Sequence, residues 1–355
     1  MKIQGYIEEM RNLAGKIGRP VRLMEVCGTH TVAGFRTGLR SLLPPGVSLL
    51  SGPGCPVCVT PTGYVDAAMA AALRDDVVVA TFGDMLRVPG TRGSLESARA
   101  GGARVEMVYS PLDALDIAKR EPGMKIVLLG VGFETTVPAV AWTIQSARQE
   151  RIGNFLVFCA HKTIPEAMAA LVEGGAGLDG YLCPGHVSVI IGPEAYEPLC
   201  RKHRIPCVIA GFEAADMAEG IVMLLRQVAE GRAGVEVQYS RGVTPGGNPE
   251  AQAVCREVFE KCDTEWRALG NIPDSGYRVR ESFGEHDAAR VLDIRQSPEA
   301  GRDPQGCRCG PVLVGKVTPS ECPLFAGRCT PATPVGPCMV SSEGTCAAYY
   351  KYGKK

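Results

Sequence analysis

Short apolar segments that alternate with amphipathic helical patterns constrain the fold of this chain more than any other feature of its sequence. They are Val21–Val26, Val47–Leu50, Val77–Thr81, Lys125–Val131, Asn154–Phe158, Gly180–Leu182 and Pro206–Ala210. Several are β-branched and apolar at every position, which is typical of strands buried on both faces of a parallel sheet. Strands that alternate with helices predict parallel sheets packed against helices. The predicted fold class is therefore α/β, with a parallel sheet and helices packed on it.

Two of these segments continue in the same way. KIVLLGVGFETT and PCVIAGFEAAD both contain Gly-Phe-Glu before a helical pattern, which places Glu134 and Glu213 in matching positions. Either the chain repeats one strand–helix unit, or glycine is favoured at this turn because it has no side chain. GVGFETT lacks the third glycine of a dinucleotide-binding loop, so we expect no nucleotide there.

The C-terminal third of the chain has a different character. Residues 231–250 are rich in glycine and proline and predict a linker, and a helix is predicted over Pro249–Leu269. Cys255 and Cys262 share the apolar face of this helix, so we expect both to pack in a core. Beyond Arg302 the periodic patterns fade, and such a segment needs another source of order, which a bound metal supplies.

The overall composition argues against several function classes. Lys and Arg together number 38, as do Asp and Glu, and aromatic residues make up 6% of the chain, so no charged surface for nucleic acid or an anionic membrane is predicted. No apolar run is long enough to cross a bilayer, and the N-terminal MKIQGYIEEMRNLAGKIG predicts a charged amphipathic helix rather than a signal peptide. We therefore expect a soluble, cytoplasmic protein.

Fifteen cysteines are unusual in such a protein. A reducing cytosol disfavours structural disulfides, so metal binding or redox chemistry explains them better. Six lie in the C-terminal tail, namely Cys307, Cys309, Cys322, Cys329, Cys338 and Cys346. Their spacing matches neither the close ligand pairs of zinc fingers nor the tight run of bacterial ferredoxins. Ligation by thiolates with no histidine nearby favours an iron–sulfur cluster or zinc, and spacing alone leaves both open.

Cys27 follows the first predicted strand and precedes a predicted helix in the motif CGTHT. We expect it at the carboxyl edge of a sheet, where α/β proteins bind ligands, and close to a helix N-terminus that lowers its pKa. Thr29 or Thr31 is expected to cap this helix, and His30 to orient the thiolate or bind a ligand. The alternative is that Cys27 packs as a small buried hydrophobic residue.

Cys55 and Cys58 form a Cys-x-x-Cys pair in the proline-rich loop SGPGCPVCVTP, which follows the second predicted strand. Two cysteines at this spacing can close a dithiol/disulfide couple or share one metal. Further polar residues follow other predicted strands, among them Glu134, His161 and His186.

Six longer motifs occur in order over nearly the whole chain. They are MEVCGTHT, SGPGCPVCVTP, GVGFETT, AHKTIPEAM, CPGHVSVIIG and CTPATPVGPCMVSSEGTCAAYYKY. In these motifs the chain resembles the HypD family of hydrogenase maturation factors. The resemblance implies two doubly wound α/β domains with parallel sheets, the first over residues 20–118 and the second over residues 119–235. It also implies a cysteine-rich third domain formed by residues 1–19 with 236–355.

The resemblance also implies cofactors and partners. It implies a [4Fe–4S] cluster whose ligands match Cys307, Cys322, Cys329 and Cys346. Cys309 or Cys338 could replace one of these four. Members of the family pair with the small chaperone HypC and carry the iron that becomes the Fe(CN)2(CO) unit of [NiFe]-hydrogenase, while HypE delivers cyanide. By matching positions, Cys27 would bind this iron together with a cysteine of HypC, and Cys55 and Cys58 would be a redox-active pair.

The function predicted from these inferences is an assembly scaffold with redox activity. Electrons would pass from the cluster to Cys55 and Cys58 and then to the iron at Cys27. Four polar residues are expected to line the cleft, where they would bond cyanide nitrogens or transfer protons: His30, Glu134, His161 and His186. Two alternatives are a thiol–disulfide oxidoreductase in which Cys27 has no essential role, and a non-redox interaction scaffold with structural zinc in its tail.

Overall fold

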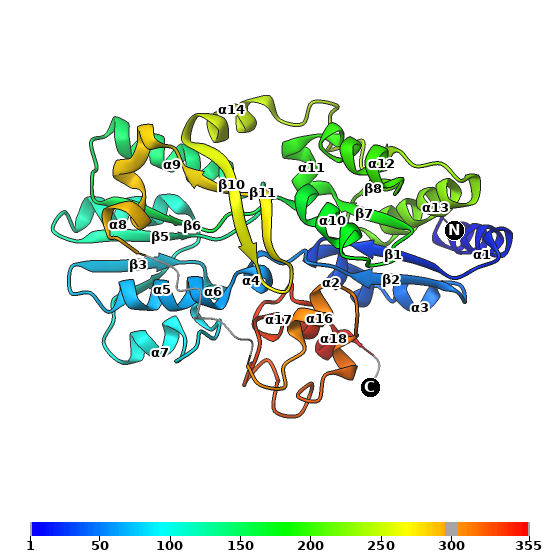
Figure 1. The fold of residues 1–355 in the computed structure, drawn as a ribbon, viewed down its shortest axis with the longest axis horizontal. Coiled ribbons are helices and arrows are strands. Elements are labelled where there is room, and N and C mark those ends of the chain that lie inside the picture. The colour runs from blue at the N-terminus through cyan, green and yellow to red at the C-terminus, as the bar shows by residue number, and fades with distance from the viewer. Residues whose placement is uncertain (1, 295–303, 354–355) are drawn as a thin grey trace.

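In the part of the chain that the structure describes, the strands form two parallel sheets and one hairpin (Figure 1). The computed structural model describes residues 2–294 and 304–353. Sheet A has the order β2 (Val47–Ser51), β1 (Val21–Glu25), β7 (Gly180–Pro184), β8 (Cys207–Ala210) and β9 (Val235–Val237). Sheet B has the order β4 (Val105–Met107), β3 (Val77–Thr81), β5 (Lys125–Gly130) and β6 (Phe155–Cys159). All pairs within sheets A and B are parallel, which confirms the predicted α/β class.

Helices cover both faces of each parallel sheet. Around sheet A lie α1 (Lys2–Ile17), α2 (Gly28–Arg36), α3 (Leu39–Leu42), α10 (Ile164–Glu173), α11 (Gly185–Ile191), the 3-10 helix η1 (Pro193–Tyr196), α12 (Glu197–His203) and α13 (Ala214–Glu230). Around sheet B lie α5 (Thr62–Ala72), α6 (Gly83–Leu86), α7 (Leu95–Ala100), α8 (Pro111–Arg120), α9 (Val137–Gln149), η2 (Glu281–His286) and α15 (Ala288–Val291). Successive residues of β5 face opposite sides, so Ile126 and Leu128 join one apolar core and Val127 and Leu129 the other.

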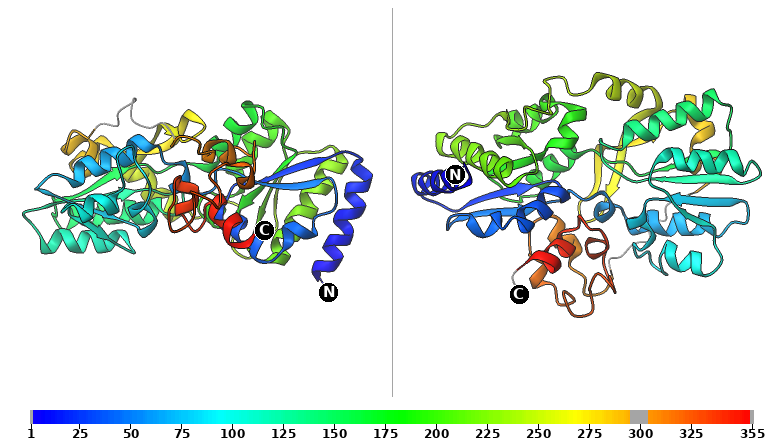
Figure 2. Two further views of the ribbon diagram at one scale, coloured as in Figure 1. Left: turned by 90° about the horizontal axis from the view of Figure 1, so that it is seen from below. Right: turned by 180° about the vertical axis from the view of Figure 1, so that it is seen from behind.

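A hairpin and the cysteine-rich tail lie between the two sheets. Helix α14 (Pro249–Val258) leads into the hairpin, which is formed by β10 (Phe259–Trp266) and β11 (Gly270–Val279). The tail contains α16 (Cys309–Leu313), η3 (Pro319–Glu321), α17 (Pro337–Val340) and α18 (Thr345–Tyr352). All three views place the tail beside the junction of the sheets, close to the short helix α4 (Pro56–Val59) (Figures 1 and 2).

The strand pairing divides the chain differently from the predicted domain boundaries. Residues 20–118 and 119–235 do not form separate sheets, because β3 and β4 pair within sheet B with β5 and β6, whereas β1 pairs with β7. The N-terminal helix α1 packs on α13 of sheet A, not with the tail as predicted. Chain order could not reveal this, since a parallel strand takes its partner through a crossover whose destination depends on tertiary packing.

The prediction of a helix over Pro249–Leu269 is also wrong for its second half. Helix α14 ends at Val258, and the following segment is strand β10. Exposed Lys261, Asp263 and Glu265 alternate there with more buried residues, as a strand requires. Cys255 packs in a core as predicted, whereas Cys262 lies half-buried on the strand. The apolar spacing fits a helical period, and only pairing with β11 makes the segment a strand.

A buried ion pair holds the carboxyl end of β1. The Glu25 carboxylate is fully buried and pairs with the Arg40 guanidinium, while Ser51 donates a hydrogen bond of 2.8 Å to the same carboxylate oxygen. Arg40 also donates to Ser51 over 2.8 Å and lies 4.6 Å from the centre of the Phe35 ring. This network joins β1, β2 and α3 at Glu25, two residues before Cys27.

Arg40→Met should therefore lower the free energy of unfolding by about 3–5 kcal/mol, because it leaves the Glu25 carboxylate buried and unpaired. Urea denaturation would measure the loss. Arg36→Met, a matched change at an exposed arginine of the preceding helix, should stay within about 0.5 kcal/mol of the wild type. Adding Glu25→Gln to Arg40→Met should restore part of the stability. No recovery would show that the lost stability does not come from the unpaired charge.

Candidate functional site

All six tail cysteines line a single small cavity. Four of them, Cys309, Cys329, Cys338 and Cys346, are buried, while Cys307 and Cys322 are partly exposed. The Cys309 and Cys338 sulfur atoms lie 2.8 Å apart, and the Cys309 and Val335 backbone N–H groups point at the sulfurs of Cys307 and Cys329 over 3.4 Å and 3.3 Å. Hydrogen bonds with Cys309 and Cys346, together with burial, raise the pKa of Cys338 well above its usual range.

The chemistry of these donors suits a thiolate-ligated group. The described lining of the cavity includes six thiols and no imidazole, and soft sulfur ligands of this kind favour iron–sulfur clusters or zinc. Within residues 2–294 and 304–353, no three His, Cys, Asp or Glu side chains stand in the arrangement of a metal-binding group. The fold therefore gathers the donors around one cavity without forming a coordination shell.

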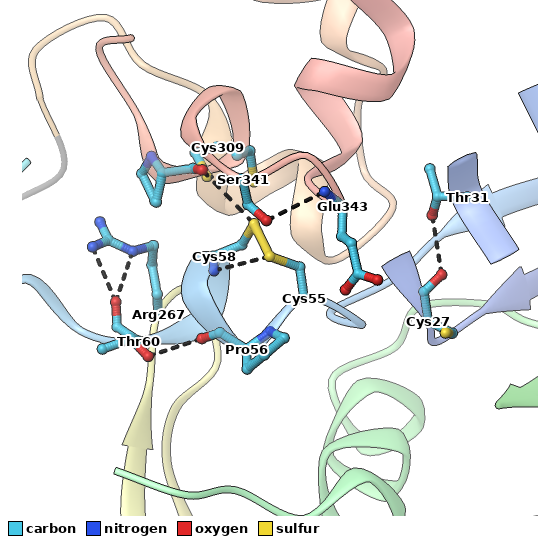
Figure 3. The surroundings of a disulfide bond; sticks show 12 residues. Cys27, Thr31, Cys55, Pro56, Cys58, Thr60, Arg267, Cys309, Ser341 and Glu343 are labelled. Carbon is cyan, nitrogen blue, oxygen red and sulfur yellow. Dashed lines mark hydrogen bonds between the residues drawn. A yellow bond between two sulfur atoms is a disulfide. The ribbon is translucent and has the colours of Figure 1, made fainter. Parts of the chain in front are cut away.

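Cys55 and Cys58 form a disulfide across the single turn of α4 (Figure 3). Their Cα atoms are 5.3 Å apart, and both side chains are buried. The Arg267 guanidinium of the hairpin donates two hydrogen bonds, of 3.2 Å and 3.0 Å, to the Thr60 carbonyl at the end of α4. The hairpin thus holds the turn that carries the disulfide.

The disulfide contacts the tail directly. Cys58 Sγ lies 3.9 Å from the carbonyl oxygen of Pro337 in α17, and the next residue, Cys338, lines the tail cavity. Figure 3 shows Cys309 and Ser341 of the tail on the same side of the disulfide. Two groups of cysteines separated by about 250 residues of chain are therefore neighbours, in line with the short contact between α4 and α17.

Cys27 lies at the carboxyl end of β1, between that strand and α2, as predicted. Its side chain is buried, and its sulfur is 3.9 Å from His186 Nε2. Burial raises the pKa of Cys27 to about 12, even though the Thr29 and His30 backbone N–H groups of α2 favour the thiolate. The predicted decrease in pKa is therefore wrong, because desolvation of the charge outweighs the helix N-terminus.

The capping predicted for α2 is also absent. The side chain of Cys27, the N-cap residue, makes no capping hydrogen bond. Thr31 donates instead to the Cys27 carbonyl over 3.3 Å, and Thr29 donates over 2.8 Å to Glu343 in the tail. A Cβ on Gly28 would lie 2.6 Å from the Glu343 backbone oxygen, so glycine allows the tail to pack against this loop.

His30 and His186 both pack against Phe212, with ring centres 4.7 Å and 5.0 Å from the centre of the phenylalanine ring. Burial lowers the pKa of each histidine to about 4, so both imidazoles are neutral near pH 7. His30 Nε2 donates to the Gly211 carbonyl over 2.9 Å, which leaves Nδ1 as an acceptor. His186, rather than His30, is therefore the histidine beside the Cys27 thiol.

Glu134 and His161 lie elsewhere, at the carboxyl edge of sheet B. Glu134 accepts a 2.9 Å hydrogen bond from the backbone N–H of Ile164, and burial raises its pKa to about 8. His161 Nδ1 is 3.4 Å from Cys159 Sγ, and burial lowers the pKa of His161 to about 3. The structure thus brings two of the four predicted polar residues to Cys27 and leaves the other two at a different sheet edge.

Two residues near Cys27 had no role in the sequence predictions. Phe212 belongs to the second Gly-Phe-Glu motif, and its counterpart Phe133 packs 6.0 Å from Trp266 in the other half of the molecule. The repeated motif was a signal that these rings serve similar positions in the two sheets. Glu343 carried no such signal, since its contact with Thr29 spans 314 positions of sequence.

Known proteins resemble this chain over nearly its whole length. The family model described as HypD, hydrogenase formation hypA family, matches residues 1–353. The chain is 45% identical to the hydrogenase maturation factor HypD of Rhodobacter capsulatus over 99% of this chain and 95% of that protein. It is 46% identical to HypD of Azotobacter vinelandii, over 99% and 97% of the two chains, and 44% identical to HypD of Escherichia coli K12, over 99% and 95%. In the described part of the chain, no helix is both long and apolar enough to span a bilayer. This chain therefore belongs to the HypD family of hydrogenase maturation factors.

Proposed function

We propose that this maturation factor is the scaffold on which, together with HypC, the Fe(CN)2(CO) unit of [NiFe]-hydrogenase is assembled in the cytoplasm. The observation that supports the proposal best is the continuity of its three groups of thiols. Gly54, next to Cys55, lies against the backbone of Cys27, and the Gly28 N–H donates to the Gly54 carbonyl over 3.0 Å. On its other side, the disulfide contacts the tail through Pro337.

Cys27 is proposed to bind the iron that is assembled. Its thiol is protonated at neutral pH because of burial, so iron must displace the proton to gain a thiolate ligand. A soft thiolate suits low-spin iron that carries cyanide and carbon monoxide. The neutral imidazole of His186 is close enough to accept that proton or to hydrogen-bond a diatomic ligand.

The Cys55–Cys58 disulfide is proposed as the redox couple of the assembly site. Its reduction to two thiols takes up two electrons and two protons, and reoxidation returns them. A [4Fe–4S] cluster held by Cys307, Cys322, Cys329 and Cys346 would supply electrons at the tail side of this disulfide when bound. Both sulfurs are buried, which argues against direct exchange with a disulfide of a partner protein.

HypC and HypE are the proposed partners. Purification of the complex with HypC under anaerobic conditions, followed by infrared and visible spectroscopy, tests the proposal. We expect infrared bands of bound cyanide after incubation with the cyanide-loaded HypE, with a further band where carbon monoxide is bound, and broad visible absorbance from the cluster. A colourless protein that contains zinc and lacks these bands would identify a structural scaffold. A coloured protein with reductase activity but no bands would identify an oxidoreductase.

A further inference from the structure

Gln238 lies directly after strand β9, at the same carboxyl edge of sheet A as Cys27. Its side chain is half-buried and makes three hydrogen bonds. Oε1 accepts the backbone N–H of Gly211 over 3.1 Å, while Nε2 donates to Asp216 over 3.1 Å and to Glu219 over 3.0 Å. Both hydrogens of the amide nitrogen are therefore used, and the oxygen is used as well.

The neighbours of this amide fix its orientation. If the amide were turned over, its oxygen would face two carboxylate oxygens and its N–H groups would face the N–H of Gly211. Asp216 is itself held by Arg241, which donates to it over 2.8 Å and keeps its pKa below the usual range, so this carboxylate stays charged at neutral pH. A Cβ on Gly211 would lie 2.2 Å from Asp216 Oδ2, so glycine lets the loop lie this close to the network.

The Gly211 peptide connects Gln238 with the histidines near Cys27. Its N–H donates to Gln238, and its carbonyl accepts the hydrogen bond of 2.9 Å from His30 Nε2. The next residue, Phe212, carries the ring against which His30 and His186 pack. A shift of this peptide would therefore move the partners of both imidazoles.

Tyr239, the residue after Gln238, packs on the same segments. Its ring centre lies 6.3 Å from that of Phe212. A Cβ on Gly185, which precedes His186, would lie 2.8 Å from the Tyr239 ring. The Tyr239 N–H donates to the Ile209 carbonyl of β8 over 3.1 Å. The segment after β9 is thus anchored to the sheet and lies against both loops that carry the aromatic stack.

We propose that Gln238 is a positioning residue for the site around Cys27. Through the loop at Gly211 it holds His30 in the tautomer with the proton on Nε2, and it keeps the imidazole of His186 beside the sulfur. Side chains of a site keep their geometry only where the groups behind them are fixed in turn. The inference rests on the proposed function, because His186 acts there only if iron is assembled at Cys27.

Nuclear magnetic resonance on the full chain with isotope-labelled histidine tests the hydrogen-bond chain without iron or a partner. A buried imidazole N–H bound to a carbonyl exchanges slowly with water and gives its own signal, and the signal missing in His30→Gln is that of His30. Gln238→Met removes all three hydrogen bonds at similar size, so the His30 signal should disappear or shift. The Nδ1–H of His286, which donates to the Phe155 carbonyl over 2.8 Å in sheet B, should be unchanged in the same sample.

An unchanged His30 signal in Gln238→Met, or no such signal in the wild type, would overturn the proposal. If Gln238→Met does not fold, Gln238→Asn replaces it, because its shorter amide cannot reach both Gly211 and the two carboxylates. The same loss or shift is expected there, and an unchanged signal has the same meaning.

The infrared spectrum of the HypC complex shows whether this positioning matters for assembly. In Gln238→Met the cyanide bands should shift in frequency, because hydrogen bonds around a metal tune its ligands and His186 is displaced. Gln227→Met is the matched control, since buried Gln227 of α13 also accepts a backbone N–H, that of Gly234 over 2.9 Å, and it should change neither the bands nor the His30 signal. Unshifted bands in Gln238→Met would refute the positioning role. Bands missing from the wild-type complex would instead refute the proposed function, and the His30 signal would still decide whether Gln238 holds the histidine.

Discussion

Replacing Cys27 by alanine is expected to remove the infrared bands of bound cyanide and carbon monoxide from the complex with HypC. The reason is that the substitution removes the thiolate proposed to anchor the iron. Loss should be essentially complete, since a neutral alanine offers no ligand. The infrared spectrum of the purified complex measures this directly.

Two controls separate ligation from folding. Cys27→Ser keeps the size of the side chain but replaces sulfur by a hard oxygen, so its bands should also disappear although the packing is preserved. Cys200→Ala removes another buried thiol, from α12 in the same half of the molecule, and should leave the bands in place. Bands that persist in Cys27→Ala would show that the iron is held elsewhere.

Gly54→Ala should both destabilise the protein and abolish assembly. A Cβ at this position would overlap the backbone N and Cα of Cys27, and also the backbone carbon of Val26. Backbone atoms cannot rotate aside as a side chain can, so the loop that carries the disulfide must separate from the loop that carries Cys27. Overpacking of this kind costs about 1–3 kcal/mol, and we expect the upper end of that range.

Denaturation with urea and the infrared spectrum of the HypC complex measure the two effects of Gly54→Ala. Gly15→Ala is the matched control, because that glycine lies inside helix α1 with nothing within 4 Å of an added Cβ. The control should raise stability by about 0.5–1 kcal/mol. If Gly54→Ala retained both wild-type stability and full bands, close contact between these loops would not be needed for assembly.

The predicted strands match the structure well because each is a short apolar run between turn signals. Val77–Thr81 is a strand over the residues predicted, and its side chains alternate between two apolar cores. The edge strands β4 and β9 were missed, since three residues each carry too little pattern to identify a strand. The hairpin strand β10 was missed for another reason, because its apolar spacing suits a helix equally well.

The candidate site was only partly predictable. The sequence identified Cys27, Cys55 and Cys58 as candidate functional residues because glycines, prolines and a histidine lie next to them. Their electrostatics depend on burial, which local sequence does not show, and this explains why the pKa of Cys27 is raised where a decrease was predicted. The same limit applies to Glu134. The sequence correctly placed this residue after a strand, but Glu134 lines a cavity other than the cleft expected around Cys27.

Local sequence patterns were enough to predict the parallel α/β class, the residues that carry the thiols and the family to which the chain belongs. Each of these depends on a local pattern or on a motif that can be recognised without knowledge of its tertiary contacts. The three-dimensional structure was needed to show which strands share a sheet, and that Cys27, the disulfide and the tail cavity are neighbours. Such contacts join segments hundreds of residues apart, so they arise from packing of the whole chain and leave no local signature.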